Sequence, residues 1–147
     1  HGGAVMIIPL LDSGELVMER QFRYVLGRHC LEFPAGKIDP GEEPLATGRR
    51  ELLEETGYVA REWIYLATIH PTVAYSTERV LVYLARGLEH RGSKLDDGEF
   101  LEVLNLSLAA LLELVRTGEI TDVKTVIGVF WLEKLLRREW GAGPVLT

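Results

Sequence analysis

The sequence has little cysteine, no excess of basic residues and no long apolar run, and each shortage excludes a class of protein. Cys30 is the only cysteine, so no disulfide can form within the chain, and a reducing compartment, the cytoplasm, is expected. Acidic residues outnumber basic ones by 22 to 16, and the net charge of −6 argues against nucleic acid as the main partner. No stretch approaches the roughly 20 apolar residues of a membrane-spanning helix, so no membrane partner is expected.

The composition is that of an ordinary globular protein. The chain has 147 residues, enough for one domain with its own core, and 47% of them are hydrophobic and 26% charged. No internal repeat, low-complexity segment or linker divides the sequence, so residues 1–147 are expected to form a single domain. Cys30 lies in an apolar run and is interpreted as a core residue rather than a nucleophile.

Strand patterns alternate with three helix patterns along the chain. Strands are expected at residues 4–11, 15–21, 29–33, 63–70, 79–86 and 100–106, and helices at 43–56, 107–117 and 122–140. The turn Asp12-Ser13-Gly14 predicts that the first two strands pair as a hairpin. The last helix has an apolar stripe interpreted as core: Val126, Val129, Phe130, Leu132, Leu135 and Leu136. This order predicts an α/β fold with a mixed central sheet between helices.

Residues 36–58 combine a helix with a cluster of carboxylates. Pro44 suits the first turn of this helix and Gly57 can close it in the left-handed conformation. Glu51, Glu54 and Glu55 are three and four residues apart, which places their side chains on one face. Crowded carboxylates repel one another unless a cation lies between them, and hard oxygen ligands favour Mg²⁺ or Mn²⁺. For this spacing alone, a solvated acidic surface is the alternative.

The whole stretch resembles the Nudix box, the signature of the Nudix hydrolases. It matches every fixed position of that motif: Gly36, Glu42, Arg50, Glu51, Leu52, Glu54, Glu55, Gly57 and Tyr58. The resemblance implies an α/β/α sandwich and Mg²⁺-dependent cleavage of a nucleoside diphosphate linked to another moiety. It also implies that Glu51, Glu54 and Glu55 are metal ligands. Arg50 would then act in the catalytic site by bracing the helix with Glu42, and Gly36 and Gly57 would be structural.

Two flanking segments narrow the resemblance to the ADP-ribose pyrophosphatase branch: Gln21-Phe22-Arg23 and the sequence L-E-F-P-A-G-K at residues 31–37. This branch implies hydrolysis of ADP-ribose to AMP and ribose 5-phosphate, the Ala35 carbonyl as a further metal ligand, and a homodimer. Residues 70–75 read H-P-T-V-A-Y where the branch more usually has S-P-G, so another nucleoside diphosphate sugar stays open as substrate. A non-catalytic nucleotide-binding regulator is a further alternative, against which the intact glutamates argue.

Several residues around the motif are candidates for substrate binding. Arg23 and Arg28 belong to a group of basic residues before and inside the motif, and the planar fork of arginine suits phosphate oxygens. Solvated surface charge is the alternative for both. Glu32 is interpreted as a structural ion pair or as a group that orients basic side chains. Tyr75, in the loop that ends at Glu78, is a candidate for contact with the base or a ribose, or is a loop aromatic packed on the domain.

The catalytic base has to come from outside the motif if the motif glutamates hold the metal. In the enzymes that this chain resembles, the base is a glutamate in the loop before the final strand. Here that loop ends at Glu99, which is the first candidate, and Glu102 is the second. If the strand begins at residue 99, alternation places these two side chains on opposite faces. A solvated acidic loop is the alternative.

Overall fold

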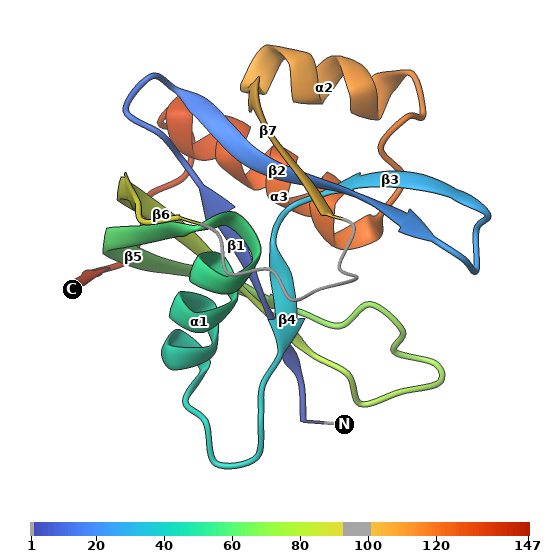
Figure 1. The fold of residues 1–147 in the computed structure, drawn as a ribbon, viewed down its shortest axis with the longest axis horizontal. Helices are drawn as coiled ribbons and strands as arrows, with labels where there is room; N and C mark the ends of the chain where they lie inside the picture. The colour runs from blue at the N-terminus through green and yellow to red at the C-terminus, as the bar shows by residue number, and fades with distance from the viewer. Residues whose placement is uncertain (1, 93–100) are drawn as a thin grey trace.

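The structure is a computed structural model that describes residues 2–92 and 101–147 (Figure 1). The chain forms three helices within these residues: α1 (Pro44–Thr56), α2 (Leu108–Arg116) and α3 (Val123–Leu136). The described strands are β1 (Ala4–Pro9), β2 (Glu15–Arg23), β3 (Arg28–Glu32), β4 (Ala35–Lys37), β5 (Tyr58–Ile69), β6 (Val80–His90), β7 (Leu101–Ser107) and β8 (Val145–Leu146). In this part of the chain, no helix is long and apolar enough to cross a membrane.

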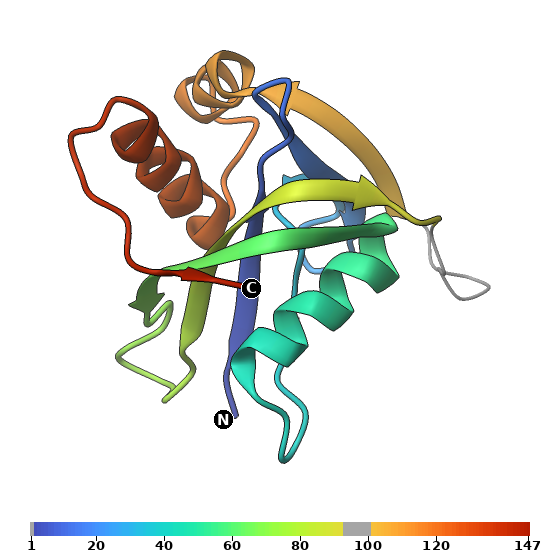
Figure 2. The same ribbon diagram turned by 90° about the vertical axis from the view of Figure 1, so that its left-hand side faces the viewer.

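The described strands form two sheets. The larger sheet has the order β4-β1-β6-β5-β8 and is mixed, because β1 runs parallel to β6 while its other pairs are antiparallel. The smaller sheet is antiparallel and has the order β3-β2-β7. Seen edge-on, α1 covers one face of the larger sheet and α3 lies on the other side (Figure 2). The predicted α/β fold with a mixed central sheet between helices is therefore confirmed.

Two hydrophobic cores lie on the two faces of the larger sheet, because alternate residues of a strand point in opposite directions. Val5 and Ile7 of β1 belong to the core under α1, together with Leu52 and Trp63. Met6 and Ile8 belong to the core on the other face, which extends to the smaller sheet and to α2 and α3. Cys30 is buried and unpaired, as predicted for a core residue.

The predicted hairpin between the first two strands is wrong. β1 pairs with β4 and β6, whereas β2 pairs with β3 and β7 in the other sheet. An isolated bridge between Leu10 and Leu16 is the only pairing described across the turn. Both faces of β1 are apolar and buried, so it takes a central position in the larger sheet. The turn itself forms as expected, with Gly14 at a φ of 90°.

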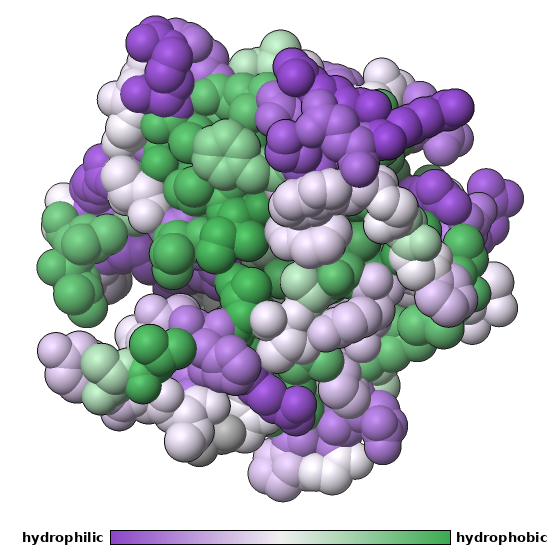
Figure 3. Space-filling model, turned by 180° about the vertical axis from the view of Figure 1, so that it is seen from behind, coloured by the Kyte–Doolittle hydropathy of each residue, from purple (hydrophilic) through white to green (hydrophobic). Residues whose placement is uncertain are grey.

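The ends of α3 and β5 also differ from the prediction. α3 begins after Asp122, whose side chain accepts from the Thr125 N–H as an N-cap, but it ends at Leu136. Its apolar stripe is only partly core, because Phe130 and Leu136 are 45% and 50% exposed. Figure 3 shows hydrophobic side chains gathered over the middle of the back of the molecule, where α3 lies. β5 begins at Tyr58, directly after the helix that precedes it.

Candidate active site

The helix α1 is fixed at both ends by residues that suit helix termini. Pro44 occupies the first turn. Gly57 has a φ of 78°, and its N–H donates to the Leu53 carbonyl at 2.9 Å. Along the helix, Gly48 packs so closely that a Cβ there would lie 3.1 Å from the ring of Trp63 on β5. The position of α1 against the larger sheet is therefore well defined, and this fixes the points on the backbone from which its glutamate side chains extend.

Arg50 ties the loop before α1 to the helix. Its guanidinium donates to both carboxylate oxygens of Glu42, at 2.9 Å each, and to the Lys37 carbonyl at 3.2 Å. It also donates to Glu51 at 2.8 Å and to Glu54 at 3.4 Å. The hydrogen bond from Arg50, followed by that from Thr47, lowers the pKa of Glu42 to about 2. Arg50 thus braces the loop and orients the first motif glutamate.

The close approach of β4 to α1 explains the glycine at position 36. A Cβ at Gly36 would lie 2.1 Å from Cδ of Glu51, a separation that real side chains do not reach. The Glu51 side chain therefore lies directly against the backbone of β4, where Ala35 precedes Gly36. Any other residue at position 36 would displace either the strand or the carboxylate.

Three carboxylates from two elements form a row near the C-terminal end of α1. Glu55 neighbours Glu51 on the same helix and Glu19 on β2. Glu19 is 1% exposed. Its Oε1 and the Oε2 of Glu55 are buried without a hydrogen-bond partner. Two ionised carboxylates offer no donor to each other, so this arrangement calls for a proton or a cation between them.

The surroundings of this row make it costly to ionise. Burial is the largest cause that raises the pKa of Glu55, to about 11, and the neighbouring Glu19 and Glu51 add to it. Burial likewise raises the pKa of Glu19 to about 7 and raises that of Glu51. Glu54 differs in its exposure, because its side chain is 53% exposed whereas that of Glu51 is 13% exposed, although Arg50 is paired with both. A cation that binds in the row would neutralise Glu19 and Glu55, for which no ion pair with a basic side chain is described in residues 2–92 and 101–147.

The donors fit a hard divalent cation, although they do not form a finished centre. Among the residues that the structure describes, no group of three or more His, Cys, Asp or Glu side chains is arranged to hold a metal ion as it stands. The available donors are the carboxylates of Glu51 and Glu55, including the unpartnered Glu55 Oε2, beside the backbone of β4. All are oxygens, the ligands that Mg²⁺ and Mn²⁺ prefer over softer metals.

A guanidinium held by a buried carboxylate lies on the same face of the smaller sheet as Glu19. Arg23 donates from Nε and Nη2 to the two oxygens of Glu32, at 2.8 Å each, and Glu32 is only 3% exposed. Glu32 is the cross-strand partner of Glu19, and paired residues share a face. Lys124 on α3 lies 3.4 Å from Glu32 and 3.0 Å from Asp122. The Arg23 side chain is 47% exposed, so one cationic group faces outward close to the row.

The other predicted substrate-binding residues are less closely tied to the row. Arg28 is the cross-strand partner of Arg23 and donates to the Thr121 hydroxyl at 2.6 Å. Tyr75 is 94% exposed in the loop between β5 and β6. The Glu78 N–H donates to the Ser76 hydroxyl in the same loop. No hydrogen bond or ion pair described for residues 2–92 and 101–147 joins Tyr75 or Glu78 to the carboxylates of α1.

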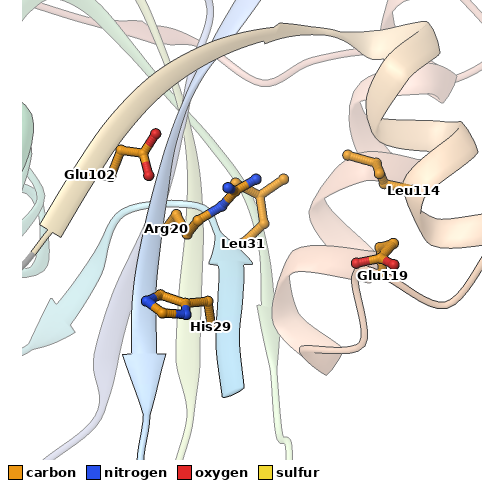
Figure 4. Close-up of a pocket in the computed structure, with 6 residues that line it drawn as sticks. All are labelled: Arg20, His29, Leu31, Glu102, Leu114 and Glu119. Carbon is orange, nitrogen blue, oxygen red and sulfur yellow. The ribbon is translucent and has the colours of Figure 1, made fainter.

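Glu102 lies on the opposite face of the smaller sheet from Glu19. β7 pairs with β2 so that Glu102 is opposite Arg20 and Val103 is opposite Glu19. Since consecutive strand residues alternate between faces, Glu102 points away from the row. It lines a separate cavity of about 400 Å³ together with Arg20 and His29 (Figure 4). Glu99, the first candidate for the base, lies outside the described residues.

Glu19 is a buried residue of the site that the sequence did not reveal. The run Leu-Val-Met at residues 16–18 is buried on both faces, so alternation gave no sign that the glutamate after it also points inward. Only the approach of β2 to α1, two elements far apart in sequence, brings Glu19 to Glu55. Lys124 on α3 was missed for the same reason.

An acidic helix beside an arginine-bearing strand offers oxygen ligands for a divalent cation next to a guanidinium that can bind a phosphate oxygen. Residues 1–125 match the family model described as the NUDIX domain, so the chain belongs to the Nudix family and is a Nudix hydrolase. Enzymes of this family in general depend on a divalent metal ion.

Curated relatives and solved structures agree with this assignment. The chain is 39% identical over 135 residues to the ADP-ribose pyrophosphatase of Bacillus subtilis (strain 168), covering 90% of this chain and 73% of that protein. It is 36% identical over 135 residues to the methanol dehydrogenase activator of Bacillus methanolicus, with the same coverage. A crystal structure of an ADP compounds hydrolase superposes with a TM-score of 0.84 at 26% identity, covering 93% of this chain and 74% of the other.

Proposed function

We propose that the protein hydrolyses the pyrophosphate bond of ADP-ribose to AMP and ribose 5-phosphate with the help of Mg²⁺ or Mn²⁺. The observation that carries this proposal is the row of carboxylates from α1 and β2, which lies near Arg23, an arginine that the buried carboxylate of Glu32 holds in place. One part can hold a divalent cation and the other can bind a phosphate oxygen. The similarity to an ADP-ribose pyrophosphatase and to an ADP compounds hydrolase supports the choice of substrate.

The residues that would hold the cation are Glu51 and Glu55, with the Ala35 carbonyl on the adjacent strand. Glu54 is a further candidate, and its side chain is more exposed than that of Glu51, at 53% compared with 13%. A bound divalent cation would neutralise the pyrophosphate and lower the pKa of a water molecule. Arg23 would bind a phosphate oxygen with the edge of its guanidinium that Glu32 leaves free, because both Glu32 oxygens already accept its Nε and Nη2. Arg28 is a further candidate for a phosphate contact.

The reaction consumes one water molecule. Its oxygen forms a bond with one phosphorus, the bond from that phosphorus to the bridging oxygen breaks, and a base accepts the proton of the water. Glu102 points to the other face of the smaller sheet, so we assign the role of base to Glu99 before Glu102. Tyr75 and Glu78 would contact the nucleoside only if the loop between β5 and β6 moves so that it covers the bound substrate.

Two alternatives carry different expectations. A Nudix hydrolase of another nucleoside diphosphate sugar would share the site and differ in the loop that contains Tyr75. A nucleotide-binding regulator would bind without turnover, and one relative is named for the activation of another enzyme. A panel of nucleoside diphosphate sugars, assayed with Mg²⁺ and a coupled phosphatase that releases phosphate only from the products, separates the three. We expect ADP-ribose to be the best substrate. Turnover of a different sugar, or binding of ADP-ribose without phosphate release, contradicts the proposal.

We also propose a homodimer, on the resemblance to the ADP-ribose pyrophosphatase branch. Exposed apolar side chains at the β2–β3 turn, Tyr24, Val25 and Leu26, support a surface that a second copy would cover. Sedimentation at micromolar concentration decides between the two states. A single species of 16.5 kDa would rule the dimer out for this chain.

A further inference from the structure

Glu19 is the most deeply buried acidic side chain that the structure describes, and it lies outside the motif that defines the family. Its exposed fraction is 1%, compared with 3% for Glu32 on the neighbouring strand. The two carboxylates are cross-strand partners, but their surroundings differ. Glu32 accepts hydrogen bonds from Arg23 and Lys124, whereas Oε1 of Glu19 has no hydrogen-bond partner among the described residues. Glu19 lies within side-chain hydrogen-bond reach of Glu55, so a proton can lie between the two carboxyl groups, but one oxygen of each is left without a partner.

Burying a carboxylate without a partner is expensive, so the open oxygen requires an explanation. An isolated buried charge is strongly destabilising even after relaxation, and an unsatisfied buried polar atom often marks the place of a water, an ion or a catalytic role. Besides its cross-strand partner Glu32, the neighbours of Glu19 on the same face include Val17 and Val103, so an apolar residue at position 19 would suit the strand. The chain places a carboxylate there instead, facing Glu55 of α1, whose Oε2 is also buried without a partner.

We propose that Glu19 is an additional carboxylate of the metal centre, contributed by β2 from across the gap to α1. It would face a hard divalent cation, Mg²⁺ or Mn²⁺, together with Glu51 and Glu55. The inference rests on the proposed metal-dependent function and adds a donor that the motif does not contain. A bound cation would then link the smaller sheet to the motif helix, so metal binding would stabilise the fold as well as the site.

Mn²⁺ binding to the full chain tests this assignment without reference to activity. The fraction of free Mn²⁺ is measured by electron paramagnetic resonance for the wild type and for Glu19→Gln, and the metal-induced rise in melting temperature is measured in parallel. Glu15→Gln is the matched control, because it removes a carboxylate from the same face of the same strand, four residues away. We expect Glu19→Gln to weaken Mn²⁺ binding by about 10-fold or more and to reduce the rise in melting temperature, while Glu15→Gln changes neither.

The outcomes separate this inference from the proposed function. Unchanged Mn²⁺ affinity in Glu19→Gln, with a wild type that binds Mn²⁺ and hydrolyses ADP-ribose, overturns the role of Glu19 and leaves the function standing. A wild type that binds no Mn²⁺ and hydrolyses nothing overturns both. If circular dichroism shows that Glu19→Gln does not fold, the same measurements on Glu19→Val replace it, since valine suits a buried strand position.

Discussion

The carboxylates at the two ends of α1 differ in their hydrogen-bond partners and in the direction in which their pKa values are shifted. At the N-terminal end, Glu42 accepts both arms of Arg50 and the Thr47 hydroxyl, and its pKa is lowered to about 2. At the C-terminal end, Glu55 lies between Glu19 and Glu51 with a buried oxygen that has no partner, and its pKa is raised to about 11. Arg50 neutralises Glu42 and also reaches Glu51, whereas no basic side chain in the described residues pairs with Glu55.

This difference assigns a structural role to the residues at one end of the helix and a metal-binding role to those at the other end. The Arg50 end is satisfied in the folded chain, so its residues hold the loop and the helix together. At the other end, no ion pair is described for Glu55 or Glu19 in residues 2–92 and 101–147, so these carboxylates are available to a cation from solution. Changes at the two ends should therefore have different consequences, with loss of stability at the first and loss of metal and activity at the second.

The largest expected effect is that of Glu55→Gln. Removing the middle carboxylate of the row should lower Mg²⁺-dependent turnover of ADP-ribose by about 100-fold or more, above the usual effect of losing a group that only supports a ligand. The metal-free variant should be at least as stable as the wild type, because an unpartnered buried oxygen has been replaced by a neutral amide. Turnover at limiting Mg²⁺ and urea unfolding in a chelator measure the two quantities. Wild-type turnover would show that Glu55 is not a ligand.

A smaller effect, on the stability of the fold rather than on turnover, is expected for Arg50→Lys. Lysine keeps the charge but cannot donate two parallel hydrogen bonds to Glu42 while also reaching Glu51. The free energy of unfolding in a chelator should fall by roughly 2 kcal/mol, the net contribution of one to two charge-assisted hydrogen bonds. Arg49→Lys, next to it on the exposed surface, keeps a cation near the ring of Trp63, which lies 6.0 Å from the Arg49 guanidinium, and should change stability by no more than about 0.5 kcal/mol. Equal effects of the two substitutions would mean that the brace contributes no stability.

The smallest expected effect is the loss of the Glu42 contribution in acid. Its pKa is about 4.5 as a free side chain and about 2 in the folded protein, so the stabilisation is complete above pH 4.5 and is lost as the pH falls toward 2. Urea unfolding of the wild type and of Glu42→Gln in a chelator, between pH 6 and pH 3, isolates this contribution. The difference between the two proteins should stay constant down to about pH 5 and shrink below it. A difference that does not change with pH would contradict the pairing.

The sequence was sufficient to predict those structural features that depend only on residues close together in the chain. Gly57 closes α1 in the left-handed conformation, and Ser107 and Asp122 cap the next two helices, as their residue types predict. The register of β7 puts Glu102 away from Glu19, and the predicted alternation between Glu99 and Glu102 stays a prediction because Glu99 lies outside the described residues. The spacing of the motif glutamates follows the helical period and placed them on one face of the helix, and the resemblance to the Nudix box singled them out as candidate ligands.

The remaining features depend on contacts between distant segments. The turn after β1 gave no sign that the chain passes into another sheet, because the pairing partners of β1 are β4 and β6. Glu19 reaches Glu55 only when β2 packs beside α1, 36 positions further along the chain. Lys124 reaches Glu32 in the same way, from a helix near the C-terminus. No local pattern distinguishes these residues from ordinary surface charges.

Anomalous diffraction from crystals soaked in Mn²⁺ tests most directly whether the open end of α1 is a metal site. We expect a peak at coordination distance from Glu51 and Glu55, beside the backbone of β4, and no peak at the Arg50–Glu42 end. A peak within reach of Glu19 would also confirm the additional ligand from β2. Crystals that show no Mn²⁺ at Glu55, while the same protein hydrolyses ADP-ribose in Mn²⁺, would contradict the assignment of this end of the helix.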